Sequence, residues 1–261
     1  RGRKEAAYMP HIYYGDPNED FSKDLVMTLA EEGADMLEFG IPFSDPTADG
    51  PTFQESCERA LGNGITPQKC IDGIRKLRSD GLEITIVVTT YFNIILAYGL
   101  EEFFAELDKV GAQGLIIPNI PLEESGLVLE IANKNDIEII FQVTPNTSDS
   151  RLQKIASASS GFLYVINFEG VTGARESLSD SVSDMIKKAR QNTEVPLMAG
   201  FGVSSRNHAR SLVSKGVDGV ITGSALADIY EKHLDNPWSS LREIENFAHE
   251  IKQGCIEGYR K

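Results

Sequence analysis

Short runs of β-branched and aromatic residues alternate along the chain with segments of helical period. Eight such runs lie at residues 11–14, 36–39, 84–90, 115–118, 137–143, 162–166, 197–200 and 219–222. Most are almost continuously apolar, as expected for parallel strands that are buried on both faces. The segments between them carry apolar residues three and four positions apart, so the pattern predicts eight repeated βα units.

The length of the chain favours a barrel. Eight units over 261 residues average about 33 residues each, which suits a (β/α)8 barrel of about 250 residues. A doubly wound open sheet is the competing arrangement, but its Gly-x-Gly-x-x-Gly turn is absent, because the first run leads into Gly-Asp-Pro at 15–17. No linker or low-complexity stretch divides the chain. The sequence therefore predicts an α/β fold, a TIM barrel in which residues 1–261 form a single domain.

The composition is that of a globular protein, with 41% hydrophobic and 25% charged residues. Its 39 acidic and 25 basic residues give a net charge of −14, which disfavours nucleic acids and anionic membrane surfaces as partners. No apolar run approaches the roughly 20 residues that a membrane span needs. The three cysteines show neither disulfide-scaffold nor zinc-site spacing, so a reducing compartment, the cytoplasm, is expected.

Histidine and lysine positions exclude two kinds of site. His11, His208, His233 and His249 show no metal-ligand spacing, and the last three fall on predicted helices, where packing or solvent-exposed roles are expected. We therefore expect no metal site. No lysine lies within the predicted strands, which argues against a Schiff-base aldolase.

Glu38 stands inside the apolar run at 36–39, where a carboxyl group is costly unless it is paired, protonated or used. One interpretation is that it faces a polar barrel interior and pairs with a lysine or arginine. The other is that it is an acid or base whose pKa is tuned by apolar surroundings.

The loop at residues 40–53 follows this run and holds Asp45 and Asp49 among three prolines. Turn chemistry alone accounts for much of this composition. A need to present a carboxylate at a fixed geometry accounts for the prolines as well. In a barrel, this loop and the one at residues 167–180 would lie at the C-terminal ends of strands, where active sites form.

Glycines follow each of the last three predicted strands. Any one of them could be an ordinary bend, but the loops at these positions, with a short extra helix, commonly form a phosphate site in TIM barrels. Backbone amides and a helix dipole would bind the phosphate, so the acidic net charge is no obstacle. We predict the short helix at residues 225–233 and the eighth outer helix at 239–253. The glycines are Gly170, Gly173, Gly200, Gly202 and Gly223, the last followed by Ser224.

Six motifs occur in a fixed order: Gly-Asp-Pro at 15–17, Leu-Glu-Phe-Gly-Ile-Pro-Phe-Ser-Asp-Pro at 37–46, Ala-Asp-Gly-Pro-Thr at 48–52, Gly-Val-Thr-Gly at 170–173, Gly-Phe-Gly at 200–202 and Gly-Ser-Ala at 223–225. Over residues 11–233 the chain closely resembles the tryptophan synthase alpha subunit family. The motif from Glu38 to Pro51 is highly specific, and the glycine pairs support it. The resemblance implies reversible retro-aldol cleavage of indole-3-glycerol phosphate to indole and glyceraldehyde 3-phosphate in tryptophan biosynthesis, without a cofactor in this subunit.

The resemblance also implies roles for individual residues. Glu38 corresponds to the catalytic glutamate, which acts in turn as acid and base, and Asp49 to a second catalytic carboxylate, which stabilises positive charge on the ring nitrogen. Seven further residues correspond to substrate-binding positions: Tyr164, Thr172, Gly173, Phe201, Gly202, Gly223 and Ser224.

A partner follows from the same resemblance, which implies an alpha2beta2 complex with a tryptophan synthase beta subunit that carries pyridoxal phosphate. We expect the contact at residues 42–51 and 93–96, where residues 94–96 form an apolar run beyond a strand end. Phe168, Asn119 and Ile94 depart from the family pattern. These departures concern loop closure and subunit contact more than the chemistry.

Two other functions fit the same sequence. A stand-alone lyase would release free indole, and no sequence feature separates it from a synthase subunit. A catalytically silent, phosphate-binding regulatory barrel is the second alternative, and the presence of both Glu38 and Asp49 argues against it.

Overall fold

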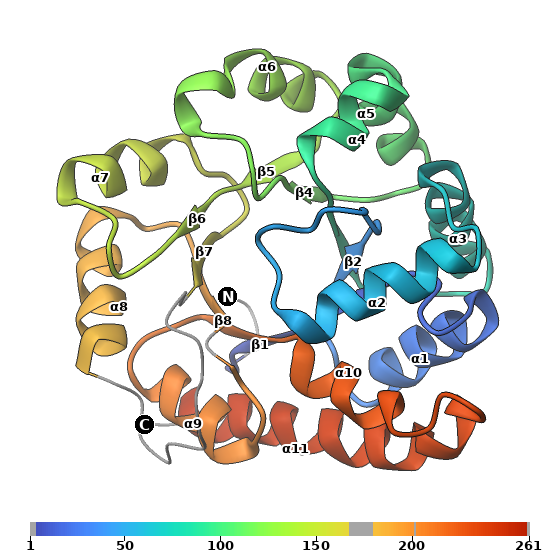
Figure 1. Ribbon diagram of the computed structural model, residues 1–261. Coiled ribbons are helices and arrows are strands. Elements are labelled where there is room, and N and C mark those ends of the chain that lie inside the picture. The colour runs from blue at the N-terminus through green and yellow to red at the C-terminus, as the bar shows by residue number, and fades with distance from the viewer. Residues whose placement is uncertain (1–3, 167–179, 201, 260–261) are drawn as a thin grey trace.

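The computed structural model describes residues 4–166, 180–200 and 202–259, and nine parallel strands lie within them. They form one sheet in the order β5-β4-β3-β2-β1-β9-β8-β7-β6. Only Phe141 separates β5 from β6 in the chain, so the sheet curls into a nearly closed barrel with helices around it (Figure 1). The predicted TIM barrel is confirmed. The strands are β1 (Ala7–Tyr13), β2 (Met36–Gly40), β3 (Thr85–Thr89), β4 (Gly114–Ile116), β5 (Glu138–Ile140), β6 (Gln142–Val143), β7 (Leu163–Ile166), β8 (Leu197–Gly200) and β9 (Gly219–Thr222).

The predicted runs at 11–14 and 137–143 differ most from the observed strands, whereas the bounds of β2, β3, β4 and β7 differ by one or two residues. The fifth run is divided into β5 and β6 because β5 pairs with β4 and β6 pairs with β7, so the extended segment changes partner at Phe141. β1 begins at Ala7 instead of residue 11, because its first four residues pair with β9 despite the proline at position 10. β8 and β9 have the predicted bounds.

The helices lie outside the barrel, and those predicted near the C-terminus correspond to α10 and α11. Single 3-10 turns occur at Leu122–Glu124 and Pro237–Ser240. The helices are α1 (Glu19–Glu31), α2 (Pro51–Gly62), α3 (Pro67–Ser79), α4 (Phe92–Tyr98), α5 (Leu100–Lys109), α6 (Gly126–Lys134), α7 (Asp149–Ala158), α8 (Asp180–Asn192), α9 (Arg206–Ser214), α10 (Ser224–Glu231) and α11 (Leu241–Tyr259).

Alternation along the strands divides the apolar side chains between two layers. The larger layer packs between the sheet and the helices. The smaller fills the inside of the barrel with Met9, Val87, Ile116, Ile140, Phe162, Tyr164, Met198 and Ile221. His11 follows Met9 by two residues and Glu38 follows Met36 by two, so both polar side chains share the inner face above an apolar floor.

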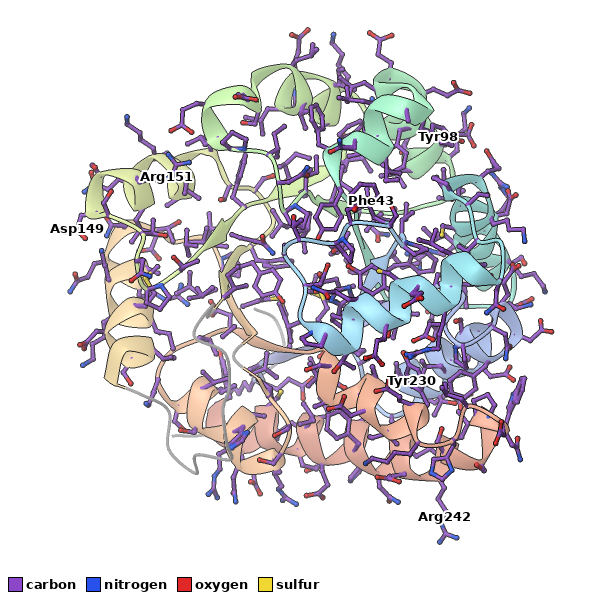
Figure 2. All side chains as sticks on the ribbon, viewed as in Figure 1. Phe43, Tyr98, Asp149, Arg151, Tyr230 and Arg242 are labelled. Carbon is purple, nitrogen blue, oxygen red and sulfur yellow. The ribbon has the colours of Figure 1, made fainter. Side chains whose placement is uncertain are left out.

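One face of the barrel carries the loop between β2 and α2. Figure 2 shows Phe43 of that loop near the middle of the face in view, whereas Asp149, Arg151 and Arg242 project from outer helices. Because all strands are parallel, this face collects the carboxyl ends of β1 to β9.

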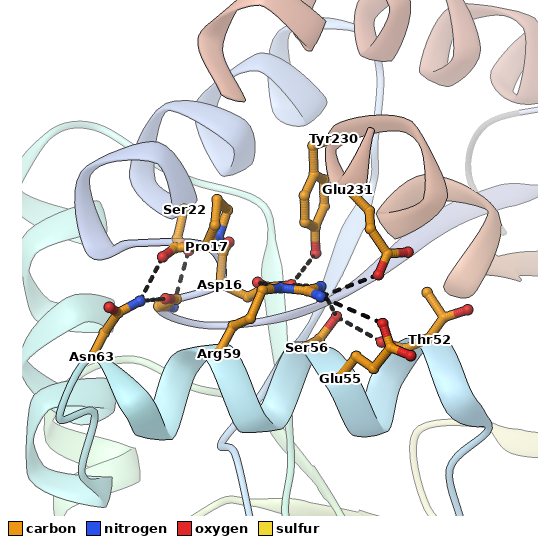
Figure 3. A network of polar contacts seen from close by, with 11 residues as sticks. Asp16, Pro17, Ser22, Thr52, Glu55, Ser56, Arg59, Asn63, Tyr230 and Glu231 are labelled. Atoms are coloured by element: carbon orange, nitrogen blue, oxygen red, sulfur yellow. Dashed lines mark hydrogen bonds and ion pairs between the residues drawn. The ribbon is translucent and has the colours of Figure 1, made fainter. Parts of the chain in front are cut away.

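A buried polar network joins the β1–α1 loop to α2 and α10, as Figure 3 shows. The Asp16 side chain is fully buried, and its carboxylate accepts hydrogen bonds from Arg59 Nε at 2.6 Å, Arg59 Nη2 at 3.0 Å and the Tyr230 hydroxyl at 2.8 Å. Arg59 Nη1 also contacts Glu231 Oε1 at 3.1 Å. The network therefore fixes two helices relative to the end of β1.

We expect Arg59→Met to reduce the free energy of unfolding by about 3 kcal/mol, because it leaves the Asp16 carboxylate buried without its cation. Urea unfolding followed by circular dichroism measures this loss. Arg151→Met is the matched control, since Arg151 pairs with Glu123 on the surface, and it should leave the unfolding midpoint unchanged. Equal midpoints for the two variants would contradict the role given to the network.

Candidate active site

A cavity of about 270 Å³ opens at the carboxyl ends of the strands. This volume is near the lower end of small-molecule sites, roughly 300–1,000 Å³. Three predicted site residues, Thr172, Gly173 and Phe201, lie outside the described residues, as does most of the predicted loop at 167–180. The other six all line the cavity: Glu38, Asp49, Tyr164, Gly202, Gly223 and Ser224.

Glu38 projects from β2 into the cavity and is only 2% exposed. Its Oε1 accepts a hydrogen bond from the Thr89 hydroxyl at 2.7 Å and lies 3.5 Å from Nδ1 of His11. Within residues 4–166, 180–200 and 202–259, these partners of Glu38 are a hydroxyl and an imidazole, and no ion pair there joins Glu38 to a lysine or arginine. Burial raises the pKa of Glu38 to about 8, and the nearby Asp49 charge adds to the rise. The carboxyl group therefore holds its proton at neutral pH.

Asp49 comes from the loop before α2 and is held by two phenols. Its Oδ2 accepts hydrogen bonds from the Tyr13 hydroxyl at 2.8 Å and the Tyr91 hydroxyl at 2.7 Å. The Ala48 amide donates to the same Tyr91 oxygen at 2.9 Å, which fixes the loop from a second side. Burial raises the pKa of Asp49, and the two phenolic donors oppose that rise because they stabilise the carboxylate.

Glycines and a helix N-terminus form another part of the cavity wall. Gly202 has a φ of 62°, a conformation that glycine adopts without strain. Gly223 precedes α10, and a Cβ there would lie 2.8 Å from the Phe53 ring, so a larger residue would have to displace that ring. Ser224 and Ala225 open α10, where backbone amides lack intrahelical partners and can bind an anion.

Tyr164 also lines the cavity. It lies in β7, opposite Gln142 of β6 and Met198 of β8, and is 8% exposed. Burial raises the pKa of Tyr164 well above its ordinary value, so its hydroxyl stays protonated.

Sequence analysis did not identify His11 as a site residue. His11 lines the cavity and is buried, with its ring 4.5 Å from the Phe53 ring and 5.1 Å from the Tyr13 ring, centre to centre. Burial lowers the pKa of His11 to about 3, so the imidazole is neutral. His11 could have been identified from the sequence, because it is a polar residue in an apolar strand, and Glu38 was singled out by that same feature.

The described part of the chain contains neither a candidate metal site nor a candidate membrane-spanning helix. No cluster of three or more histidine, cysteine or acidic side chains there could hold a metal ion. Nor does any helix within it have the length and apolar character needed to cross a membrane.

Comparison with known proteins decides the family. A model of the tryptophan synthase alpha chain family matches residues 1–256. The chain is 42% identical over 244 residues to the tryptophan synthase alpha chain of Geobacillus kaustophilus, covering 92% of this chain and 90% of the relative. It is 38% identical over 251 residues to that of Gloeobacter violaceus, covering 96% and 90%. The chain belongs to the tryptophan synthase alpha chain family.

Solved structures agree with this membership. The alpha2beta2 tryptophan synthase complex of Pyrococcus furiosus contains a chain that is 34% identical, with a TM-score of 0.88 and coverage of 95% of this chain and 98% of that chain. A tryptophan synthase structure from Mycobacterium tuberculosis contains one that is 30% identical, with a TM-score of 0.87 and coverage of 97% and 93%. The family that the motifs predicted is confirmed.

We expect the raised pKa of Glu38 to make the fold less stable as the pH rises from about 4.5 to about 8. In that window the folded chain keeps a proton that the unfolded chain has lost, so unfolding becomes easier with increasing pH. Glu38→Gln removes this titration, and its stability relative to the parent should increase between pH 5 and pH 9. Urea unfolding at a series of pH values measures the difference.

Glu130→Gln is the control for this titration. The hydrogen bond from Lys134 lowers the pKa of this exposed carboxyl, so its stability difference from the parent should stay constant over the same pH range. A constant difference for Glu38→Gln as well would show that Glu38 ionises normally.

Proposed function

We propose that Glu38 and Asp49 carry out, in this member of the tryptophan synthase alpha chain family, the reversible cleavage of indole-3-glycerol phosphate to indole and glyceraldehyde 3-phosphate. The observation that carries the proposal is the contrast between the two carboxyl groups. Glu38 is buried beside neutral partners with a pKa of about 8, and Asp49 is held by two phenolic donors. One is suited to move a proton and the other to remain charged.

Glu38 first donates a proton to the substrate and then accepts another proton from it. As an acid it donates its proton to C3 of the indole ring, which places a positive charge on the ring nitrogen. As a carboxylate it then takes the proton of the chain hydroxyl next to the ring. While that carbon becomes the aldehyde, the carbon–carbon bond breaks and its electron pair restores the aromatic ring and neutralises the nitrogen. Glu38 ends protonated, so no proton is gained or lost.

Asp49 supports the step at which charge develops. A carboxylate fixed beside the ring N–H stabilises the positively charged ring more than it stabilises the neutral substrate. This difference lowers the activation free energy of the cleavage reaction. The hydrogen bonds from Tyr13 and Tyr91 set its position before substrate binds, so little reorganisation is needed.

The substrate phosphate binds at the other end of the cavity. The amides at the start of α10, together with Gly202 and Gly223, provide the anion site, and Thr172, Gly173 and Phe201 complete substrate binding by analogy with the family. Tyr164 lines the same cavity, and we place it beside the ring and chain of the substrate. One domain, residues 1–261, supplies all of these groups.

The proposed chemistry uses side chains alone as acid, base and charge stabiliser, so we assign no cofactor to this subunit. Pyridoxal phosphate is assigned to the partner beta subunit, which would condense the released indole with serine. The three cysteines are free thiols and buried, which supports a location in the reducing cytoplasm.

We expect Glu38→Gln to lower the rate of indole-3-glycerol phosphate cleavage more than about 100-fold, because the amide keeps the shape and cannot transfer the proton. Asp49→Asn should lower kcat more than it raises KM, since the charge it stabilises forms only during reaction. Indole release measures both. Asp45→Asn in the same loop is the control and should keep full activity, because Asp45 is exposed.

A Glu38→Gln variant within about tenfold of the parent, roughly 1.4 kcal/mol in activation free energy, would remove Glu38 from the mechanism. An Asp49→Asn effect confined to KM would instead make Asp49 a substrate-binding residue.

We expect Ser224→Asp to raise the KM for indole-3-glycerol phosphate at least about tenfold, because a carboxylate at the start of α10 repels the phosphate. Ser224 is exposed, so the substitution does not disturb packing, unlike a side chain at Gly223. Ser224→Ala keeps the amides and should bind normally. In the reverse reaction the KM for indole should stay unchanged, and an equal loss for indole would place the phosphate elsewhere.

We also propose that the chain works with a beta subunit, as the Pyrococcus furiosus relative does in its alpha2beta2 complex. The expected contact surface needs one correction. Residues 94–96 lie in α4, and Ile95 is fully buried in the core because one side of this helix packs inward. Leu96 faces outward and is 55% exposed. The proposed interface therefore consists of residues 42–51 with Asn93, Ile94 and Leu96, without the buried Ile95.

We expect Leu96→Asp to abolish association with a matched beta subunit in sedimentation experiments, because it places a charge in an apolar contact. Leu127→Asp is the control, since Leu127 is equally exposed on α6 and lies outside the proposed interface. An unmodified chain that does not associate and is fully active alone would be a stand-alone lyase.

A further inference from the structure

Two residues of the cavity wall each hold a buried polar atom that has no hydrogen-bond partner among the described residues. These atoms are Nε2 of His11 and Oε2 of Glu38. Both residues line the cavity. A buried polar atom without a partner costs free energy, so a site that keeps two of them together is suited to a ligand that supplies the missing hydrogen bonds.

The barrel holds the two side chains as a pair. β1 and β2 are parallel neighbours in which His11 lies directly opposite Glu38. Nδ1 of His11 lies 3.5 Å from Oε1 of Glu38, and Thr89 donates to that same oxygen. Nδ1 of the imidazole and Oε1 of the carboxyl group therefore lie beside each other, whereas the second polar atom of each side chain has no partner among the described residues.

The His11 ring cannot easily turn away from this position. The Phe53 and Tyr13 rings pack against it at 4.5 Å and 5.1 Å between centres. A neutral imidazole has one donor nitrogen and one acceptor nitrogen, so Nε2 can form one hydrogen bond with a hydroxyl group in either tautomer. Simple packing would need only an apolar ring at this position.

We propose that His11 is a specificity-determining residue that hydrogen-bonds through Nε2 to the second hydroxyl of the substrate's glycerol chain. This inference rests on the proposed function. The chain of indole-3-glycerol phosphate carries two adjacent hydroxyls, and the reaction consumes the O–H bond of only the one next to the ring. Glu38 Oε2 meets that first hydroxyl, and His11 on the neighbouring strand meets the second.

Such a contact gives strong discrimination against a substrate that lacks the hydroxyl. An enzyme site built to hydrogen-bond a substrate hydroxyl rejects the analogue without it, because its buried polar groups are then left unpaired. His11 would thereby select the diol over a singly hydroxylated chain with the same ring and phosphate.

The test compares indole-3-glycerol phosphate with its analogue that lacks the second chain hydroxyl. The unmodified chain should prefer the diol by at least about 100-fold in kcat/KM. His11→Phe keeps an aromatic ring and should lose most of this preference, with a large fall for the diol and less than about threefold change for the analogue. His11→Gln keeps a donor and an acceptor and should recover part of the preference.

Two controls separate this role from damage to the fold. Indole-3-propanol phosphate lacks both hydroxyls, so its Kd should be the same for the parent, His11→Phe and His11→Gln. Ile12→Val alters the next residue of β1, which packs in the outer layer, and should keep the full preference.

Equal losses for the diol and the analogue in His11→Phe, or an unchanged preference, would overturn the inference and leave His11 a packing residue. In that case the unmodified chain would still cleave indole-3-glycerol phosphate. If the unmodified chain cleaves neither substrate, the proposed function fails, and the inference fails with it.

Discussion

The Glu38 carboxyl group is buried in the barrel beside two groups without charge, the Thr89 hydroxyl and the His11 imidazole. A lysine or arginine in either place would stabilise the carboxylate, lower its pKa and deprive it of a proton to donate at neutral pH. Burial among neutral partners has the opposite effect and holds the pKa near 8. The acid step that we propose for Glu38 therefore requires that cations and bulk water stay away from the two carboxyl oxygens.

The barrel supplies that environment by its topology. Closure of a parallel sheet buries the inner face of every strand, and the carboxyl ends of all strands meet at one face. Glu38, Thr89 and Tyr164 consequently share a cavity although they are far apart in the chain. The Asp16 network adds the outer constraint, because it fixes α2 and α10 relative to β1. Those helices carry Phe53 and Ser224 into the same cavity.

The strands could be predicted because buried parallel strands are continuous apolar runs, and the family could be predicted because the Glu38 to Pro51 motif is so specific. The contacts within the site could not. The Tyr13–Asp49 hydrogen bond joins the last residue of β1 to the loop before α2, and these two segments meet only when the barrel has formed. The burial of Ile95 could not be predicted either. The apolar run at 94–96 does not indicate which residue faces the core until the helix is known to begin at Phe92.

Tyr91 connects Asp49 to the rim of the barrel. Its hydroxyl donates to the Asp49 carboxylate and accepts from the Ala48 amide, and its backbone caps the start of α4. Asn119 accepts a hydrogen bond from the Phe92 amide and donates to Asn93, so the neighbouring β4 loop holds the same helix end. The same residue therefore both begins α4 and donates a hydrogen bond to Asp49. A partner bound at Leu96 would act on Asp49 through this path, and since such coupling is reciprocal in binding free energy, substrate at Asp49 would alter the partner's affinity by the same factor.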